Sequence, residues 1–174
     1  MTIIEEKEIP MIGKAMQDAM NEQINKELFS AYLYLSMAAY FEGKNLPGFA
    51  HWMRLQADEE REHAMKFYDF ILERGGQVLL KAIAAPATEW KSNFEVVEEV
   101  AAHEAKVTAS IHALYELALK EKDYAAQVML QWFITEQVEE EKNAAELVAK
   151  LKMIEERSTA VLMLDHRLEK RNNG

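Results

Sequence analysis

Four long stretches of the chain repeat apolar residues at alternating intervals of three and four positions. This spacing places the apolar side chains on one face of a helix, as in helices that pack together in a bundle. Gly and Pro, which interrupt helices, cluster between these stretches. A shorter stretch near the C-terminus repeats the pattern with Val161, Leu164 and Leu168. We therefore expect five helices, at about 11–42, 48–74, 92–121, 124–152 and 158–171.

The lengths of the connections predict how the four long helices are arranged. Only a few residues separate the first two helices, and only a few separate the last two, so each pair is expected to run antiparallel. Residues 75–91, between the pairs, are numerous enough to run the length of a bundle. The predicted fold class is all-α, a four-helix bundle with one long crossover connection and a short fifth helix. A chain of 174 residues fits one such domain over residues 1–174.

Polar residues interrupt the apolar face of each long helix near its middle. In an antiparallel pair, residues equally far from the turn lie side by side. Glu27 lies 17 positions before residue 44 in the first turn, and Glu60 lies 16 positions after it. Glu104 and Glu140 both lie 18 positions from residue 122 in the second turn. At ~1.5 Å per residue, six polar side chains should share one level of the core. They are Glu27, Glu60, His63, Glu104, Gln137 and Glu140.

Four carboxylates that converge in a core repel one another and lose their hydration, so they require a positive partner. The chain has no Cys, which leaves carboxylate and imidazole groups as metal ligands. Glu60 and His63 lie on one helical face and can bind the same ion. Two divalent ions ~3.5–4 Å apart would neutralise the four carboxylates. This is the pattern of di-iron carboxylate bundles, except that Gln137-x-x-Glu140 replaces a second Glu-x-x-His, so one ion should be held more loosely.

Charge and hydropathy exclude several classes of partner. Lys and Arg number 20 against 30 Asp and Glu, a net charge of −10, which argues against nucleic acid and favours cations. The most apolar run, residues 29–41, is 13 residues long and too short to cross a membrane. Residues 1–10 lack the basic and then apolar pattern of a signal peptide. We expect a cytoplasmic protein with neither a nucleic-acid nor a membrane partner.

Four segments carry a specific resemblance to a known family: residues 21–27 (NEQINKE), 58–64 (DEEREHA), 103–104 (HE) and 136–142 (EQVEEEK). Over nearly its whole length the chain resembles ferritins of the non-haem kind found in bacteria and archaea. A haem is not expected. The haem-bearing relatives, the bacterioferritins, carry Met where Arg61 stands and a second Glu-x-x-His where Gln137-x-x-Glu140 stands.

The resemblance implies an activity and assigns roles to individual residues. It implies that Fe(II) is oxidised by O2 or H2O2 at a di-iron ferroxidase centre, and that the ferric product is stored as a mineral inside a hollow shell of 24 subunits. Glu60 would bridge the two ions, Glu140 would lie near the second, and Tyr34 would lie next to the centre. The family's ferroxidase ligands match Glu27, Glu60, His63, Glu104 and Gln137, and a third iron site matches Glu59, Glu136 and Glu139.

Alternatives remain open from the sequence. The same ligands could serve a di-iron enzyme without storage, or the core acids could be relics in a purely structural helical assembly. Tyr34 could supply an electron, or its hydroxyl could only hydrogen-bond a ligand carboxylate. The fifth helix could close a four-fold axis of a shell or pack on its own bundle. The other histidines, expected at the surface or in helix packing, are His51, His103, His112 and His166.

Overall fold

Five helices make up most of the computed structural model, which describes residues 11–154 and 158–170. They are α1 (Lys14–Gly43), α2 (Pro47–Glu73), α3 (Asn93–Glu121), α4 (Tyr124–Ile154) and α5 (Ser158–Leu168). Each boundary lies within three residues of its predicted position; the largest differences are at the start of α1 and the end of α5. No helix in the described part of the chain has a stretch both long and apolar enough to span a membrane.

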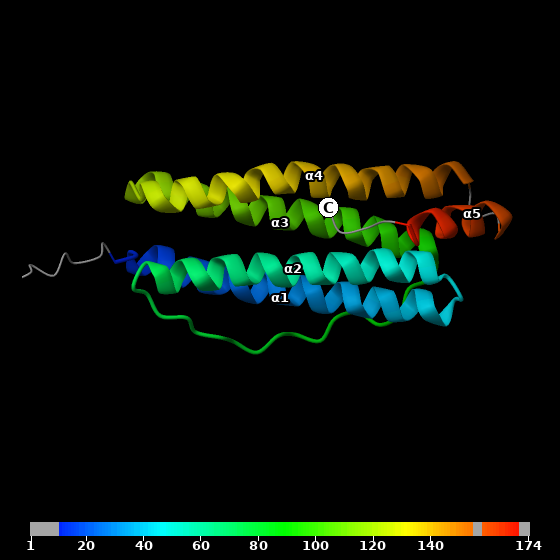
Figure 1. Cartoon of the computed structure of the whole chain (residues 1–174), viewed down its shortest axis with the longest axis horizontal. Helices are drawn as coiled ribbons and strands as arrows, with labels where there is room; N and C mark the ends of the chain where they lie inside the picture. The colour runs from blue at the N-terminus through cyan, green and yellow to red at the C-terminus, as the bar shows by residue number, and fades with distance from the viewer. Residues whose placement is uncertain (1–10, 155–157, 171–174) are drawn as a thin grey trace, which may run out of the picture.

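The four long helices form a bundle of two antiparallel pairs. α1 packs along α2, and α3 packs along α4. Figure 1 shows the connection between α2 and α3 running the length of the bundle beside the first pair, with α5 at the end of the bundle where α4 ends. The predicted fold, a four-helix bundle with one long crossover and a short C-terminal helix, is confirmed.

Local chemistry fixes where the helices end. α1 and α3 are followed by residues with positive φ, Asn45 (58°) and Lys122 (56°), which reverse the chain. The Ser92 hydroxyl accepts a hydrogen bond from the Glu95 N–H (3.1 Å) and caps the start of α3. The Asp123 carboxylate accepts one from the Ala126 N–H (3.0 Å) and caps α4. These caps set the axial register of each helix, and hence the level of its polar residues.

The crossover has no regular structure, and polar side chains of α1 hold it in place. Asn21 is buried; its amide donates to the Gln77 carbonyl (3.0 Å), and its carbonyl accepts from the Leu79 N–H (2.7 Å). Further along, the Ser36 hydroxyl donates to the Ala87 carbonyl (2.5 Å). The backbone N–H and C=O groups of the crossover are not paired within a helix or sheet. Because side chains of α1 hydrogen-bond to several of them, the segment can lie along α1.

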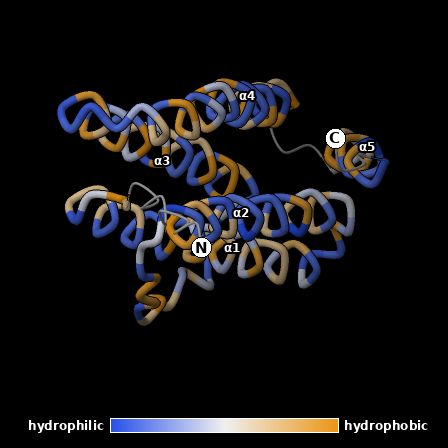
Figure 2. Tube along the Cα trace, turned by 60° about the vertical axis from the view of Figure 1, so that its left-hand side comes forward, coloured by the Kyte–Doolittle hydropathy of each residue, from blue (hydrophilic) through white to orange (hydrophobic). Residues whose placement is uncertain are grey.

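The apolar core has two parts, separated by the polar layer. One cluster contains Leu33, Ala57, Val100 and Ala144, and the other contains Ile24, Ala64, Val107 and Phe133. In every long helix the predicted polar positions fall between these two clusters. Figure 2 shows orange and blue alternating along each helix, as expected for helices with one buried face. The predicted common level of the polar side chains is therefore present.

The short helix α5 packs on its own bundle, mainly against the start of α2. Val161 and Leu164 are buried there. The buried Asp165 carboxylate accepts a hydrogen bond from the Phe49 N–H (2.8 Å). It thereby satisfies a free N–H in the first turn of α2 and places a negative charge at the positive end of the helix dipole. Of the two placements considered, packing on the chain's own bundle is observed, and a place at a four-fold axis stays a prediction.

Replacing Gly48 with Ala should loosen this contact. A Cβ on Gly48 would lie 1.8 Å from the Asp165 carbonyl oxygen, so α5 must move away from α2. We expect a loss of about 1–3 kcal/mol in the free energy of unfolding, measured by denaturant titration, with faster amide exchange in α5. Gly43→Ala is the matched control, because a Cβ there meets nothing within 4 Å. Equal stability of the two variants would contradict the contact.

Candidate metal centre

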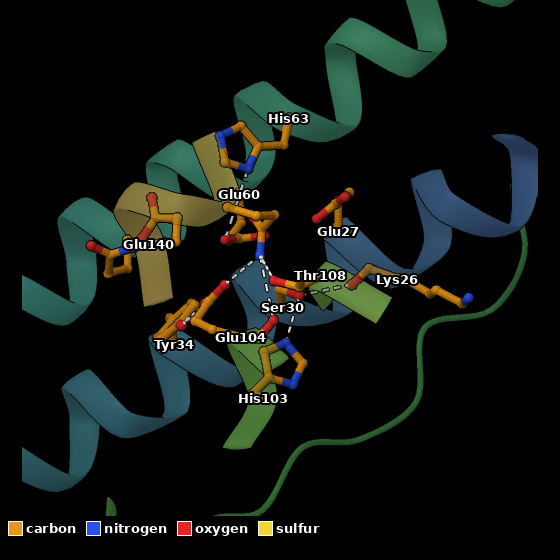
Figure 3. Close-up of polar contacts among 12 residues, drawn as sticks. Lys26, Glu27, Ser30, Tyr34, Glu60, His63, His103, Glu104, Thr108 and Glu140 are labelled. Atoms are coloured by element: carbon orange, nitrogen blue, oxygen red, sulfur yellow. Dashed lines mark hydrogen bonds and ion pairs between the residues drawn. The ribbon is translucent and has the colours of Figure 1, made fainter. Parts of the chain in front are cut away.

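The polar layer brings three potential metal ligands from two helices together. Glu27 on α1 and Glu60 and His63 on α2 each offer one ligand atom, and these atoms all lie within 4.8 Å of one another. All three side chains are buried, and Figure 3 shows them gathered in one group between α1 and α2. Within residues 11–154 and 158–170, no other set of three or more His, Asp or Glu side chains is grouped so closely.

Three carboxylate oxygens in this cluster lack a hydrogen-bond donor. They are both oxygens of Glu60 and Oε2 of Glu27, and in the described part of the chain the only donor within reach of them is a proton shared between these two carboxyl groups. The His63 Nδ1 lies 3.9 Å from Glu60 Oε1, beyond hydrogen-bond range. A buried carboxylate oxygen without a partner costs several kcal/mol. Either a shared proton or a cation must therefore serve these oxygens.

The third helix contributes Glu104, whose two oxygens are both held by neighbours. The Tyr34 hydroxyl donates to Oε1, and the Gln137 amide donates to Oε2 (3.2 Å). The same Gln137 nitrogen also reaches the Thr108 hydroxyl (3.2 Å). Because an amide nitrogen only donates, the Gln137 carbonyl oxygen is the atom of that side chain that can bind a cation.

Glu140, from α4, is the fourth buried carboxylate of the layer and, like Glu104, lies outside the close group of Glu27, Glu60 and His63. It is buried, and its Oε2 accepts a hydrogen bond from the buried Gln56 amide (2.9 Å). In Figure 3, Glu140 lies on the other side of Glu60 from Glu27. Glu60 is thus the carboxylate between the two halves of the layer, and the one with both oxygens free of donors.

Burial keeps protons on these acids when no cation is present. It raises the pKa of Glu27 from 4.5 to about 7, although hydrogen bonds with Glu60 and Gln23 lower that pKa. It raises the pKa of Glu60 well above the usual range, and the charges of Glu27 and Glu104 add to the effect. The pKa of Glu104 is also raised by burial, although Tyr34 and Gln137 stabilise its charged form. These buried carboxyl groups ionise readily only when a positive charge lies beside them. A divalent cation can supply that charge and replace the protons.

His63 is held as a neutral imidazole. Burial, and then the charge of Lys66, lowers its pKa to about 4. Its ring packs edge-on against Trp132 (5.5 Å between centroids) and Phe133 (5.7 Å). A neutral ring fixed by aromatic neighbours is the form of histidine that binds metal ions.

Tyr34 is fully buried beside Glu104. Burial, followed by the charges of Glu104 and Glu60, raises its pKa well above 10, so the hydroxyl stays protonated and donates. Of the two roles considered, the hydrogen bond to a carboxylate of the centre is present. Electron donation by Tyr34 stays a prediction.

The three acids assigned to a third iron site are not gathered into a cluster. Glu59 and Glu136 are half-buried, and Glu139 is exposed. Burial raises the pKa of Glu136, and the charge of Glu139 raises it further, while Lys66 lowers it. These acids lie outside the close group of Glu27, Glu60 and His63. A third iron site at these residues stays a prediction.

Sequence reasoning missed several residues that surround the centre. Gln23 donates to Glu27 Oε1 (2.8 Å) and is buried, although it lies off the predicted apolar face. Its position four residues before Glu27 on one helix was the available signal. His103, expected at the surface or in helix packing, is half-buried against Phe29 and Tyr34, and its Nε2 lies 2.7 Å from the Ser30 hydroxyl. Gln23, Ser30 and His103 line one groove beside the layer.

Comparisons with known proteins agree with this arrangement. A family model described as the ferritin-like domain matches residues 17–154. The bacterial non-heme ferritin of Bacteroides fragilis (strain 638R) is 45% identical over 142 residues, 82% of this chain and 89% of the relative. That of Staphylococcus aureus (strain USA300) is 36% identical over 158 residues, 91% and 95% of the two chains. A solved structure described as a novel open-pore ferritin from the archaeon Archaeoglobus fulgidus is 50% identical, with a TM-score of 0.91 over 92% of this chain and 98% of that one.

Proposed function

The chain belongs to the ferritin family, and we propose that it stores iron, which it oxidises from Fe(II) to Fe(III) at the centre between its four long helices. One observation carries the proposal beyond family membership: buried carboxylates from separate helices meet at one level, and three of their oxygens have no donor. Two Fe(II) ions supply the positive charge that four carboxylates require. The chain is then a ferroxidase as well as a store.

The donor atoms divide between two substrate ions. Glu27 Oε2, one oxygen of Glu60 and the neutral imidazole of His63 can hold the first. The other Glu60 oxygen, together with groups of the opposite half, can hold the second. Those groups are Glu104, Glu140 and the Gln137 carbonyl oxygen. The second ion has no imidazole among these ligands, so we expect it to bind more weakly and to leave after oxidation.

The ligands also favour the oxidised product. Carboxylates stabilise Fe(III) over Fe(II), because the added positive charge strengthens each contact with a negatively charged oxygen. Two Fe(II) ions supply the two electrons that, with two protons from the solvent, reduce O2 to H2O2, or H2O2 to two molecules of water. Tyr34 holds Glu104 in place, and Gln56 holds Glu140, while iron arrives and leaves.

Storage requires a container, which we propose is a shell of 24 copies. The net charge of −10 per chain suits a shell that concentrates cations. Glu59, Glu136 and Glu139 would take iron from the centre toward the interior, as the family resemblance implies. The cytoplasmic location expected from the sequence is part of the same proposal.

Size-exclusion chromatography followed by aerobic iron loading tests this function. A shell should elute near about 480 kDa, the mass of 24 chains of 20.0 kDa, and should keep far more than two Fe(III) per chain in solution. An assembly that stops at about two Fe(III) per chain would indicate a di-iron enzyme without storage. Absence of tight Fe(II) binding in anaerobic calorimetry would leave a structural assembly and would contradict the proposal.

A further inference from the structure

A chain of three hydrogen bonds runs from the protein surface to a carboxylate of the metal centre. The Lys26 ammonium donates to the Ser110 hydroxyl (2.8 Å), the Ser110 hydroxyl donates to the Gln23 carbonyl, and the Gln23 amide donates to Glu27 Oε1 (2.8 Å). The chain crosses from α1 to α3 and back. Its surface end lies in a groove of about 390 Å³, lined by Lys26, Gln23 and Ser110 among others.

The chemistry of its two ends sets the direction of this chain. An ammonium group can only donate, so the Ser110 oxygen accepts from Lys26 and its proton points to Gln23. The Gln23 carbonyl must then face Ser110, which turns the amide N–H₂ toward Glu27. A flipped amide would place its carbonyl oxygen against the Glu27 carboxylate, another acceptor. It would also place its N–H₂ against the Ser110 proton, another donor. Lys26, through Ser110, and the Glu27 carboxylate thus favour the same orientation of Gln23, with its amide nitrogen toward the centre.

The result is a fixed orientation of Glu27. Its Oε1 is occupied by the Gln23 amide, which leaves Oε2 as the donorless oxygen in the group with Glu60 and His63. Gln23 is 1% exposed, so no bulk water can replace its bonds. Lys26, in contrast, is exposed, and Figure 3 shows it extending away from the centre.

We propose that Gln23, Ser110 and Lys26 are positioning residues that present Glu27 to iron through a single oxygen. The inference rests on the proposed function, because it concerns the same centre. None of the three residues touches a substrate ion; each acts through Glu27. Outer groups that orient a metal ligand typically change metal affinity or activity by about 10–100-fold.

Metal binding and metal-free crystal structures of four variants test the proposal. Anaerobic titration with Fe(II), and with Co(II) for its visible spectrum, should show about 10–100-fold weaker binding of one ion to Gln23→Met. Ser110→Ala should weaken binding less, and Ser110→Thr, which keeps the hydroxyl, should restore it. In the metal-free crystals, Glu27 should adopt more than one conformation in Ser110→Ala and one in Ser110→Thr.

Asn25→Ala is the matched control. Asn25 is close to Gln23 on α1 and lines the same groove, but its amide donates to the Lys81 and Ala82 carbonyls of the crossover instead of the centre. The proposal is overturned if Gln23→Met and Ser110→Ala bind metal like Asn25→Ala and keep a single Glu27 conformation. If the wild-type protein binds no iron while Ser110→Ala still disorders Glu27, the proposed function fails and the positioning role stands. Should Gln23→Met fail to fold, the Ser110 pair decides alone.

Discussion

Replacing Glu60 with Gln slows Fe(II) oxidation by about 100-fold or more, a larger loss than expected for any neighbour that only orients a ligand. Both Glu60 oxygens are free of donors, and the side chain lies between the two halves of the centre. The amide keeps the shape of the side chain but exchanges one of these oxygens for a nitrogen that cannot bind a cation, and removes one negative charge. Stopped-flow absorbance of Fe(III) formation, at two Fe(II) per chain, measures the rate.

Glu62→Gln provides the control for this experiment. It makes the same chemical change two residues away, at an exposed position of α2. Both variants should elute as the wild-type assembly, because neither change adds volume to the core. His63→Ala should also oxidise Fe(II) slowly. Wild-type rates in Glu60→Gln and His63→Ala would show that oxidation takes place elsewhere.

Replacing Glu27 with Gln stabilises the metal-free protein, and the gain grows as the pH rises. Burial raises the pKa of Glu27 from 4.5 to about 7 in the folded state. Below pH 4.5 the Glu27 carboxyl is protonated in both the folded and unfolded states, so its ionisation does not change the free energy of unfolding. As the pH rises to 7, ionisation of Glu27 increasingly favours the unfolded chain. The free energy of unfolding of the wild-type protein therefore falls by about 3 kcal/mol, whereas that of the amide variant does not. The Gln side chain still offers an oxygen to Gln23.

Guanidinium unfolding of metal-free protein at pH 5 and pH 8 measures the effect. The difference between Glu27→Gln and wild type should be small at pH 5 and near its maximum at pH 8. Adding a divalent metal should reverse the order, because only the wild-type carboxylate gains from binding. Exposed Glu62→Gln should show neither behaviour. A difference that does not depend on pH would mean that Glu27 ionises as freely in the fold as in the unfolded chain.

The fold and the level of the site could be predicted because both depend on periodicity. Apolar spacing places each helix, and counting from the turns predicts the level of Glu27 against Glu60 and of Glu104 against Glu140. The structure bears out this level, since the polar positions separate two apolar clusters in every long helix. The largest differences between predicted and observed helix ends lie at the start of α1, where no side chain caps the helix, and at the end of α5, because periodicity alone does not mark a helix end.

The surroundings of the centre could not be predicted, because they join residues that no periodic pattern links. Ser110 meets Gln23 only after α1 and α3 are packed together, and Asp165 meets the start of α2 across more than a hundred residues. Periodicity shows that two residues share a level, but not which of them supplies a donor to the other. The roles of Glu59, Glu136 and Glu139 stay predictions, because the described structure does not bring these three side chains into one close group.

Anomalous diffraction from crystals soaked anaerobically with Fe(II) tests the central claim most directly. Data collected on both sides of the iron absorption edge should show two peaks per chain in the polar layer. One should lie beside Glu27 and His63, the other on the Glu104 and Glu140 side, with Glu60 between them. Peaks only at the surface, or none in a crystal that contains iron, would contradict a centre in which buried carboxylates gather to bind iron.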